Sequence, residues 1–107
     1  MAGNRKSVQD ICEKFVLLSV GYETPNKEIV DAWMKWFGSI KDHTVDGGSP
    51  FGPEMEVTSA GVKQLPHDRG AIAGYTIINA KNMEEAVKIA KSCPIITSMR
   101  VYEAMSM

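Results

Sequence analysis

The chain has 107 residues, of which 44% are hydrophobic and 23% are charged. This length limits it to one domain with a modest core, and this composition is that of a globular protein rather than a disordered one. Twelve basic and thirteen acidic side chains give a formal net charge of -1. Since nucleic-acid binding depends on clustered Lys and Arg, the charge balance argues against a nucleic-acid partner. We predict a single domain over 1–107, with a lead-in at 1–12 and a core at 13–107.

The cysteine count and the hydropathy exclude several other classes of protein. Cys12 and Cys93 are too few for a disulfide framework, and no CxxC or Cys/His zinc spacing occurs. The first residues lack the apolar region of a signal peptide, and the longest aliphatic stretch, 15–20, is too short to span a bilayer. We therefore expect a cytoplasmic protein without a membrane partner, and no metal, redox or nucleotide cofactor is indicated.

The first predicted elements are a strand and a helix. The segment Glu13–Val20 carries an apolar run from Phe15 onward with one polar break at Ser19, and such a run, ended by Gly21, is typical of a strand buried on both faces. Thr24 and Pro25 predict a helix start, because Thr can cap a helix and Pro suits the first helical position. Apolar residues then recur at helical spacing, at Ile29, Trp33, Trp36, Phe37 and Ile40. The two tryptophans fit core packing, with the wall of a ligand pocket as the alternative, and Gly38 is a candidate fraying point or C-cap.

The middle of the chain predicts a loop and two strands. Residues 46–53 are dense in turn formers and cannot continue a helix or a central strand. Strand character resumes over Met55–Leu65, where Gly61 indicates a bulge or a bend. A polar turn at 66–70 leads to a further strand over Ala71–Ala80.

The last elements are a helix and a strand. Asn82 and Glu85 have the spacing of a capping box, and the helix closes at Ser92-Cys93-Pro94. Met99–Met105 is the last predicted strand. The order strand, helix, strand, strand, helix, strand predicts an α+β ferredoxin-like βαββαβ sandwich, a four-stranded antiparallel sheet with two helices on one face.

The strands alternate poorly between apolar and polar residues, so neither face of the sheet is polar. In the first strand, for example, Phe15 and Leu17 oppose Val16 and Leu18. Two helices can cover only one face, which leaves on the order of 400 Å² of flat sheet area uncovered. We therefore predict a homodimer in which two sheets pack face to face.

Several short motifs occur together in order. They are Trp33-x-x-Trp36-Phe37, Val45-Asp46-Gly47-Gly48-x-Pro50-Phe51-Gly52, Gly61, Gly74-Tyr75-x-Ile77-Ile78-x-Ala80, Glu85-Ala86 with Cys93-Pro94, and Val101-Tyr102-Glu103. Through them the chain, from about Phe15 to Met105, resembles the YCII-related group, also called DGPF-domain proteins, of the dimeric α/β-barrel superfamily.

The resemblance implies a ferredoxin-like subunit that pairs through its sheet into a dimer, but it implies less about function. Most members have no assigned activity, and relatives include a dehydrochlorinase acting on a chlorinated hydroxyquinol. Some members carry a His–Asp pair proposed for acid–base chemistry, with the His early in the first helix. Here Ile29, Val30 and Ala32 occupy that region, so the His role cannot be carried over. Asp46 matches the aspartate before the Gly-rich turn.

Two residues near this turn are candidate catalytic groups, His43 and Asp46. Histidine titrates near neutral pH, and a carboxylate that orients its ring can make it a general base. The alternative for His43 is a solvated side chain in a polar connection. The alternative for Asp46 is an Asx hydrogen bond to the glycine amides.

The candidate ligand-binding residues are Gly47, Gly48, Tyr75, Arg100 and Tyr102. The glycines could bring backbone amides to an anionic ligand, although their spacing matches neither a P-loop nor a dinucleotide fingerprint. The other three could line a polar and aromatic pocket for a small anionic or phenolic ligand. Their alternative role is in the dimer interface.

These observations predict a homodimer with a small-molecule pocket in each subunit, an acid–base enzyme acting on a small organic acid or a phenolic substrate. The alternative is a non-catalytic ligand-sensing or protein-interaction homodimer, which the missing helix histidine favours. A third hypothesis is a dimer with a purely structural role.

Overall fold

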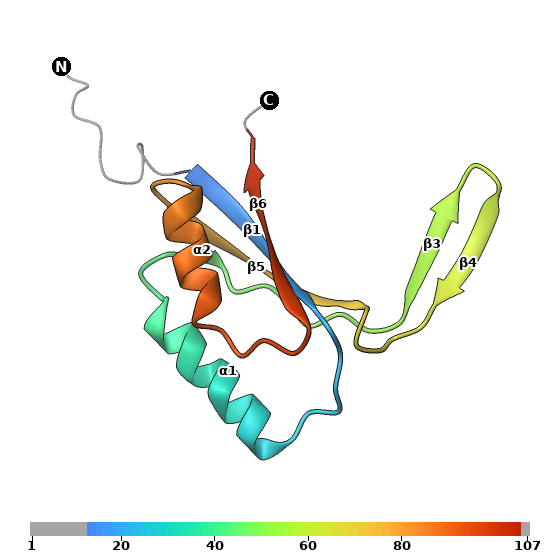
Figure 1. The fold of residues 1–107 in the computed structure, drawn as a ribbon, viewed down its shortest axis with the longest axis horizontal. Coiled ribbons are helices and arrows are strands. Elements are labelled where there is room, and N and C mark those ends of the chain that lie inside the picture. Colours follow the sequence, from blue (N-terminus) through green and yellow to red (C-terminus); the bar gives the residue numbers. More distant parts are fainter. Residues whose placement is uncertain (1–12, 106–107) are drawn as a thin grey trace.

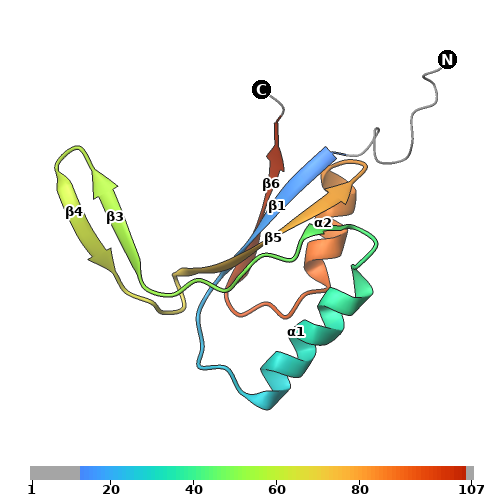
Figure 2. The ribbon, with the colours of Figure 1, turned by 180° about the vertical axis from the view of Figure 1, so that it is seen from behind.

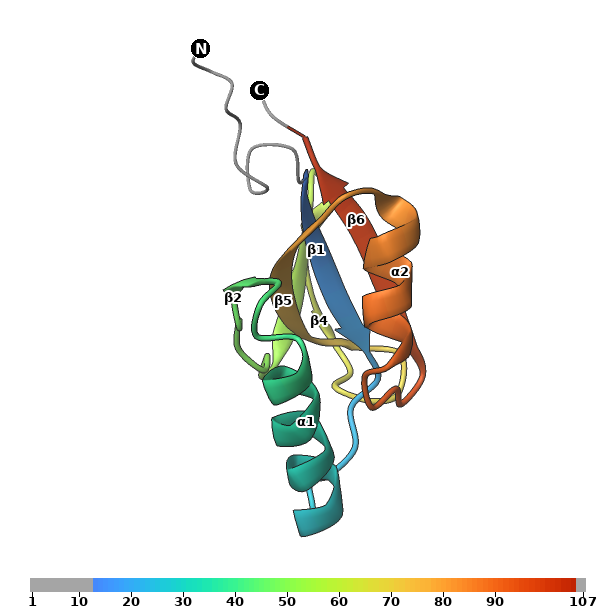
Figure 3. The same ribbon diagram turned by 90° about the vertical axis from the view of Figure 1, so that its left-hand side faces the viewer.

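A computed structural model describes residues 13–105, which form eight elements in chain order. They are β1 (Glu13–Val20), α1 (Lys27–Ser39), β2 (Thr44–Asp46), β3 (Glu54–Thr58), β4 (Gly61–Leu65), β5 (Ile72–Ala80), α2 (Met83–Lys91) and β6 (Ser98–Ala104). Four strands form an antiparallel sheet in the order β2-β5-β1-β6. Both helices lie on one face of this sheet (Figure 3). The predicted α+β class with a four-stranded antiparallel sheet is confirmed, and the arrangement is compatible with a ferredoxin-like fold.

The core lies between the sheet and the helices. Phe15 and Leu17 of the central strand β1 are almost fully buried, and Phe15 pairs across the sheet with the equally buried Ile78. Val16 and Leu18 alternate with them and are only half-buried, because they point to the other face. No described helix lies over that second face, which we call the open face (Figure 2).

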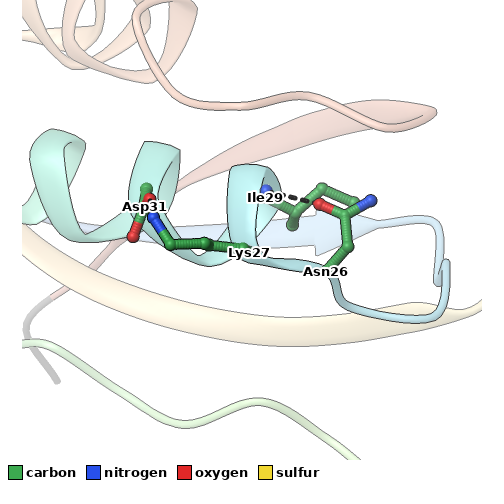
Figure 4. A network of polar contacts seen from close by, with 4 residues as sticks. All are labelled: Asn26, Lys27, Ile29 and Asp31. Atoms are coloured by element: carbon green, nitrogen blue, oxygen red, sulfur yellow. Dashed lines mark hydrogen bonds and ion pairs between the residues drawn. The ribbon is translucent and has the colours of Figure 1, made fainter.

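The two helices begin at asparagine caps. Asn26 Oδ1 accepts a hydrogen bond from the Ile29 N–H at 2.9 Å, and an exposed ion pair of 3.1 Å follows between Lys27 and Asp31 (Figure 4). The predicted start at Thr24 and Pro25 is therefore wrong by two residues, because the Asn side chain supplies the acceptor that the first turn needs.

The end of α1 also differs from the prediction. Gly38 is not the C-cap, because the helix runs to Ser39 and the Ile40 N–H still bonds to the Trp36 carbonyl at 3.1 Å. In α2, by contrast, the predicted cap is confirmed. Asn82 Oδ1 accepts from the Glu85 N–H at 2.9 Å.

The prediction of one strand over Met55–Leu65 is wrong. This segment is the hairpin β3–β4, which forms a two-stranded sheet of its own. The chain reverses after Thr58, whose Oγ1 accepts from the Ala60 N–H at 3.2 Å, and Gly61 has a φ of +148°. The predicted bend is thus a full turn.

The place beside β5 is taken instead by residues for which no strand was predicted. The short strand β2 pairs there, and Pro50 forms an isolated bridge to Gly74. The hairpin then projects from the side of the sheet away from both helices (Figure 1).

Candidate functional site

A groove of about 540 Å³ lies between α1 and the sheet. It exists because the first turns of α1 do not pack closely on the strands, and Trp36 is the only residue of this helix that is buried. The opposite wall comes from the end of β1, the first half of β5 and the loop 47–50. Volumes of about 300–1,000 Å³ are typical of small-molecule sites.

The groove is mainly apolar. The helix contributes one continuous stripe, because residues three and four apart share a helix face. Its members are Ile29, Val30, Trp33, Met34 and Phe37. The Trp33 and Phe37 rings are 5.8 Å apart, and both pack against the edge of the core. Val30 and Met34 of this stripe are exposed, and contiguous exposed apolar surface is a mark of interaction sites and ligand grooves.

The loop with the glycines is fixed tightly against β5. Gly48 has a φ of +77°, and a Cβ there would lie 1.7 Å from the Tyr75 carbonyl oxygen, so only glycine fits. Its N–H donates to Asp46 Oδ1 at 2.8 Å. Asp46 therefore makes the Asx turn that was its alternative reading, and the Gly48 amide is already bonded rather than presented to a ligand.

Polar groups on the walls are few and mostly paired. Thr76 Oγ1 donates to the Gly47 carbonyl at 3.2 Å, and Glu23 forms an ion pair with Arg69 at 2.6 Å. Glu23 is the only charged residue among the described residues that line the groove. The groove thus offers no described cation to a carboxylate or a phosphate.

The two candidate catalytic residues lie outside this groove. His43 Nδ1 is 3.0 Å from the Asn79 carbonyl oxygen, at the edge where β2 meets β5. Asp46 Oδ2 accepts from the Tyr75 hydroxyl at 3.4 Å. Within residues 13–105 no hydrogen bond joins His43 to Asp46, so the structure pairs Asp46 with Tyr75 instead.

The candidate ligand-binding residues divide into two places. Gly47 and Gly48 line the groove, and so does Tyr75. Tyr75 alternates with buried Thr76, however, so its ring points to the open face, where it stacks on Phe51 at 5.7 Å. Arg100 lies on this same face, because both it and Tyr75 pair with Leu18 of β1.

The same register places Tyr102 on the open face. It pairs with Val16, which pairs in turn with Ile77 on β5. The predicted polar and aromatic group of Tyr75, Arg100 and Tyr102 therefore shares one face of the sheet, opposite the helices. Neighbouring strands lie about 4.8 Å apart, so the backbones at Tyr75 and Arg100 are about 10 Å apart, with β1 between them.

The two tryptophans lie in different places, and each fits one of the two hypotheses, core packing or the wall of a ligand pocket. Trp36 is 3% exposed, and its Nε1–H donates to Ser92 Oγ at 3.1 Å, so it belongs to the core. Trp33 is half-buried and lines the groove. The sequence signal for the groove was the width of the apolar stripe on α1, which exceeds what a helix ending at the edge of a small sheet can bury.

Metal-binding clusters and membrane-spanning helices do not occur in the part of the chain that the structure describes. No three His, Cys, Asp or Glu side chains of residues 13–105 come together in a way that could hold a metal ion. Among these residues no helix is long and apolar enough to cross a membrane. Cys93 is buried, and desolvation raises the pKa of its thiol from 9.0 to about 11. Cys12 lies outside the described residues.

Comparison with known proteins gives no family. A scan against protein-family models found no match to this chain, and a search of curated proteins found none either.

Proposed function

We propose that this chain is a YCII-like subunit that binds a small, neutral, apolar molecule in the groove between α1 and the sheet, and that it does so as a homodimer. The single observation that carries the binding function is the groove itself. Its volume of about 540 Å³ suits a ligand of one or two rings, and its walls are built mainly of apolar side chains.

The charge of the walls favours a neutral ligand over the small organic acid that the sequence predicted. The lining carries one charged group, the Glu23 carboxylate, and it contains no Lys, Arg or His from residues 13–105. An acid bound there would lose its hydration without gaining a cation. A phenol keeps its apolar ring in the groove and needs only one polar partner, which Ser19 or Ser49 can supply.

The open face supports the homodimer. Two adjoining cross-strand pairs lie on it, Val16 with Ile77 and Leu18 with Tyr75. All four side chains are half-buried in the single chain. An antiparallel sheet with one solvated face normally carries polar residues there. A second copy packed sheet to sheet at about 10 Å would cover these side chains.

A second candidate function, the acid–base enzyme, has one observation in its favour. Asp46 accepts a hydrogen bond from Tyr75 on the face that also carries Arg100. A carboxylate, a phenol and a guanidinium on one surface can abstract a proton and stabilise the resulting anion. Such a site would lie between the two sheets of the homodimer rather than in the groove.

Tryptophan fluorescence with two probes of equal size tests the binding function. Naphthol is neutral and naphthoate is anionic at pH 7, and each would be titrated into the full chain. We expect naphthol to quench the fluorescence at micromolar to millimolar concentration, and naphthoate to bind at least tenfold more weakly, because the walls offer it no cation.

Matched variants locate the site. Trp33→Phe should abolish most of the quenching, whereas Trp36→Phe should retain it, because only Trp33 lines the groove. Asp46→Asn should leave naphthol affinity unchanged if the ligand lies in the groove. Equal binding of both probes, or quenching that depends on Asp46 and not on Trp33, would contradict the proposal and favour a site on the open face.

A further inference from the structure

The hairpin β3–β4 stands on the same side of the sheet as the open face. In Figures 1 and 2 the sheet separates the hairpin from both helices, and in Figure 3, which looks at the helices, the hairpin lies behind the sheet. It leaves the body just after Phe51, whose N–H donates to the Ala73 carbonyl at 2.7 Å. The ring of Phe51 stacks on Tyr75 of the open face. The base of the hairpin and the open face are thus one continuous surface.

One face of the hairpin is apolar and uncovered. Val57 pairs directly with Val62, and the two are 74% and 64% exposed. Met55, two residues before Val57, lies on the same face and is 60% exposed, and its cross-strand partner Gln64 is the polar member of this face. The neighbouring pair on the other face is Glu56 with Lys63. This alternation is that of a strand pair with one buried face, yet no part of residues 13–105 buries it.

A hairpin of this kind needs cover to be ordered. An isolated two-stranded hairpin is at best marginally stable in water, and an exposed apolar strand pair is an aggregation hazard. We propose that the hairpin is an arm, and that its apolar face, defined by Met55, Val57 and Val62, clasps a second copy of this chain. The inference rests on the proposed homodimer and adds a second contact surface to it.

The interface area argues for a second copy as the occupant. The open face alone offers on the order of 400 Å², about half of the roughly 800 Å² that each partner buries in an interface of standard size. Each face of the arm adds roughly 160 Å². In a two-fold dimer each copy gives one arm and receives the other, so the buried area per copy reaches roughly 700 Å².

Position and charge agree with this occupant. A second sheet packed on the open face lies on the side from which the arm projects, so the arm reaches it without rearranging. A net charge of -1 gives little repulsion between copies.

Sedimentation equilibrium of the full chain with two double variants tests the proposal. Val57→Thr with Val62→Thr keeps the shape and the strand preference of the pair but makes its face polar. Glu56→Thr with Lys63→Thr is the matched control, because it changes the adjacent pair on the other face and leaves the net charge at -1. We expect the first variant to raise the dimer Kd at least tenfold and the control to change it less than threefold.

Hydrogen exchange of residues 54–65 provides a second measurement that does not depend on a variant. We expect amide exchange in the arm to slow when the protein concentration is raised through the dimer Kd. If the wild type dimerises and the two double variants have equal dimer Kd values, the arm is overturned and the proposed homodimer stands. A wild-type chain that is monomeric at every concentration overturns the homodimer and the arm together. Arm amides already protected in the dilute monomer overturn the proposal in favour of cover from the same chain.

Discussion

The two helices begin in the same way and then differ in what they do for the fold. Each has an Asn cap whose Oδ1 accepts a backbone N–H at 2.9 Å. In α2, Ala86 is fully buried and Ala90 is 3% exposed, so the helix packs closely on β1, β5 and β6. In α1 the apolar stripe is wider than the surface that the helix can bury, and the residues that stay unburied line the groove.

This difference follows from side-chain size. Small residues such as Ala let a helix backbone approach a sheet, whereas α1 packs against the core through the large rings of Trp33, Trp36 and Phe37. The closely packed α2 and the buried Trp36 of α1 therefore stabilise the fold, and the remaining apolar stripe of α1 leaves room for a ligand. We expect variants in the two regions to separate stability from binding.

The largest expected effect is at the tryptophans. Trp36→Ala removes a buried ring and its hydrogen bond to Ser92, and should lower the free energy of unfolding by about 3–5 kcal/mol. Trp33→Ala removes a half-buried ring from the groove wall and should cost less than about 2 kcal/mol. Urea unfolding of both variants measures the difference. Equal losses would show that α1 is packed along its whole length.

A smaller effect is expected when an alanine is enlarged in each helix. Ala86→Leu inserts three carbons into a contact with no free space and should destabilise the protein by about 1–3 kcal/mol. Ala32→Leu, on the exposed side of α1, should change the stability by no more than about 0.5 kcal/mol. Thermal unfolding of the pair checks this prediction. A loss in Ala32→Leu as large as in Ala86→Leu would contradict the difference between the helices.

An effect that depends on pH is expected at Cys93, just after α2. Because burial raises the thiol pKa from 9.0 to about 11, the folded state favours the neutral thiol, and this stabilisation is present below pH 9. It should be lost as the pH rises from 9 to 11, since the unfolded thiol ionises first. The stability of Cys93→Ala should therefore fall less than that of the wild type over this range.

Alkylation of the folded protein provides a check on the same group. At pH 8 only about one thiol in a thousand would be ionised at Cys93, so its peptide should react slowly with iodoacetamide, as mass spectrometry can measure. Labelling as fast as in the denatured chain would show that Cys93 is not held in the packed region beside α2.

Local sequence predicted the elements that stand on strong local signals. Strand β1 has the predicted bounds, Glu13–Val20, because an apolar run broken only at Ser19 and ended by Gly21 leaves few alternatives. The cap of α2 followed from Asn82 and Glu85. In contrast, β2 has three residues and too little periodicity to be recognised, and Gly61 fits a bend as well as it fits a turn.

The candidate site was predicted only in part. Asp46 and the glycines were expected near a ligand, and Gly47 and Gly48 do line the groove. The expected partner of Asp46 was His43, a neighbour in sequence, but the structure pairs Asp46 with Tyr75 from another strand. The order of strands in the sheet sets such a contact, and residue spacing along one segment does not encode it.

The sequence by itself determined the α+β class, most strand and helix positions and the apolar character of both sheet faces, because these depend on periodicity and on neighbours a few residues apart. Only the tertiary structure decided that α1 stands off the sheet, that the chain over Glu54–Leu65 is a projecting hairpin, and which polar residues share a face. These features depend on packing between segments that are distant in sequence. In a close-packed interior, where one segment can lie depends on the volumes of the side chains of all the others.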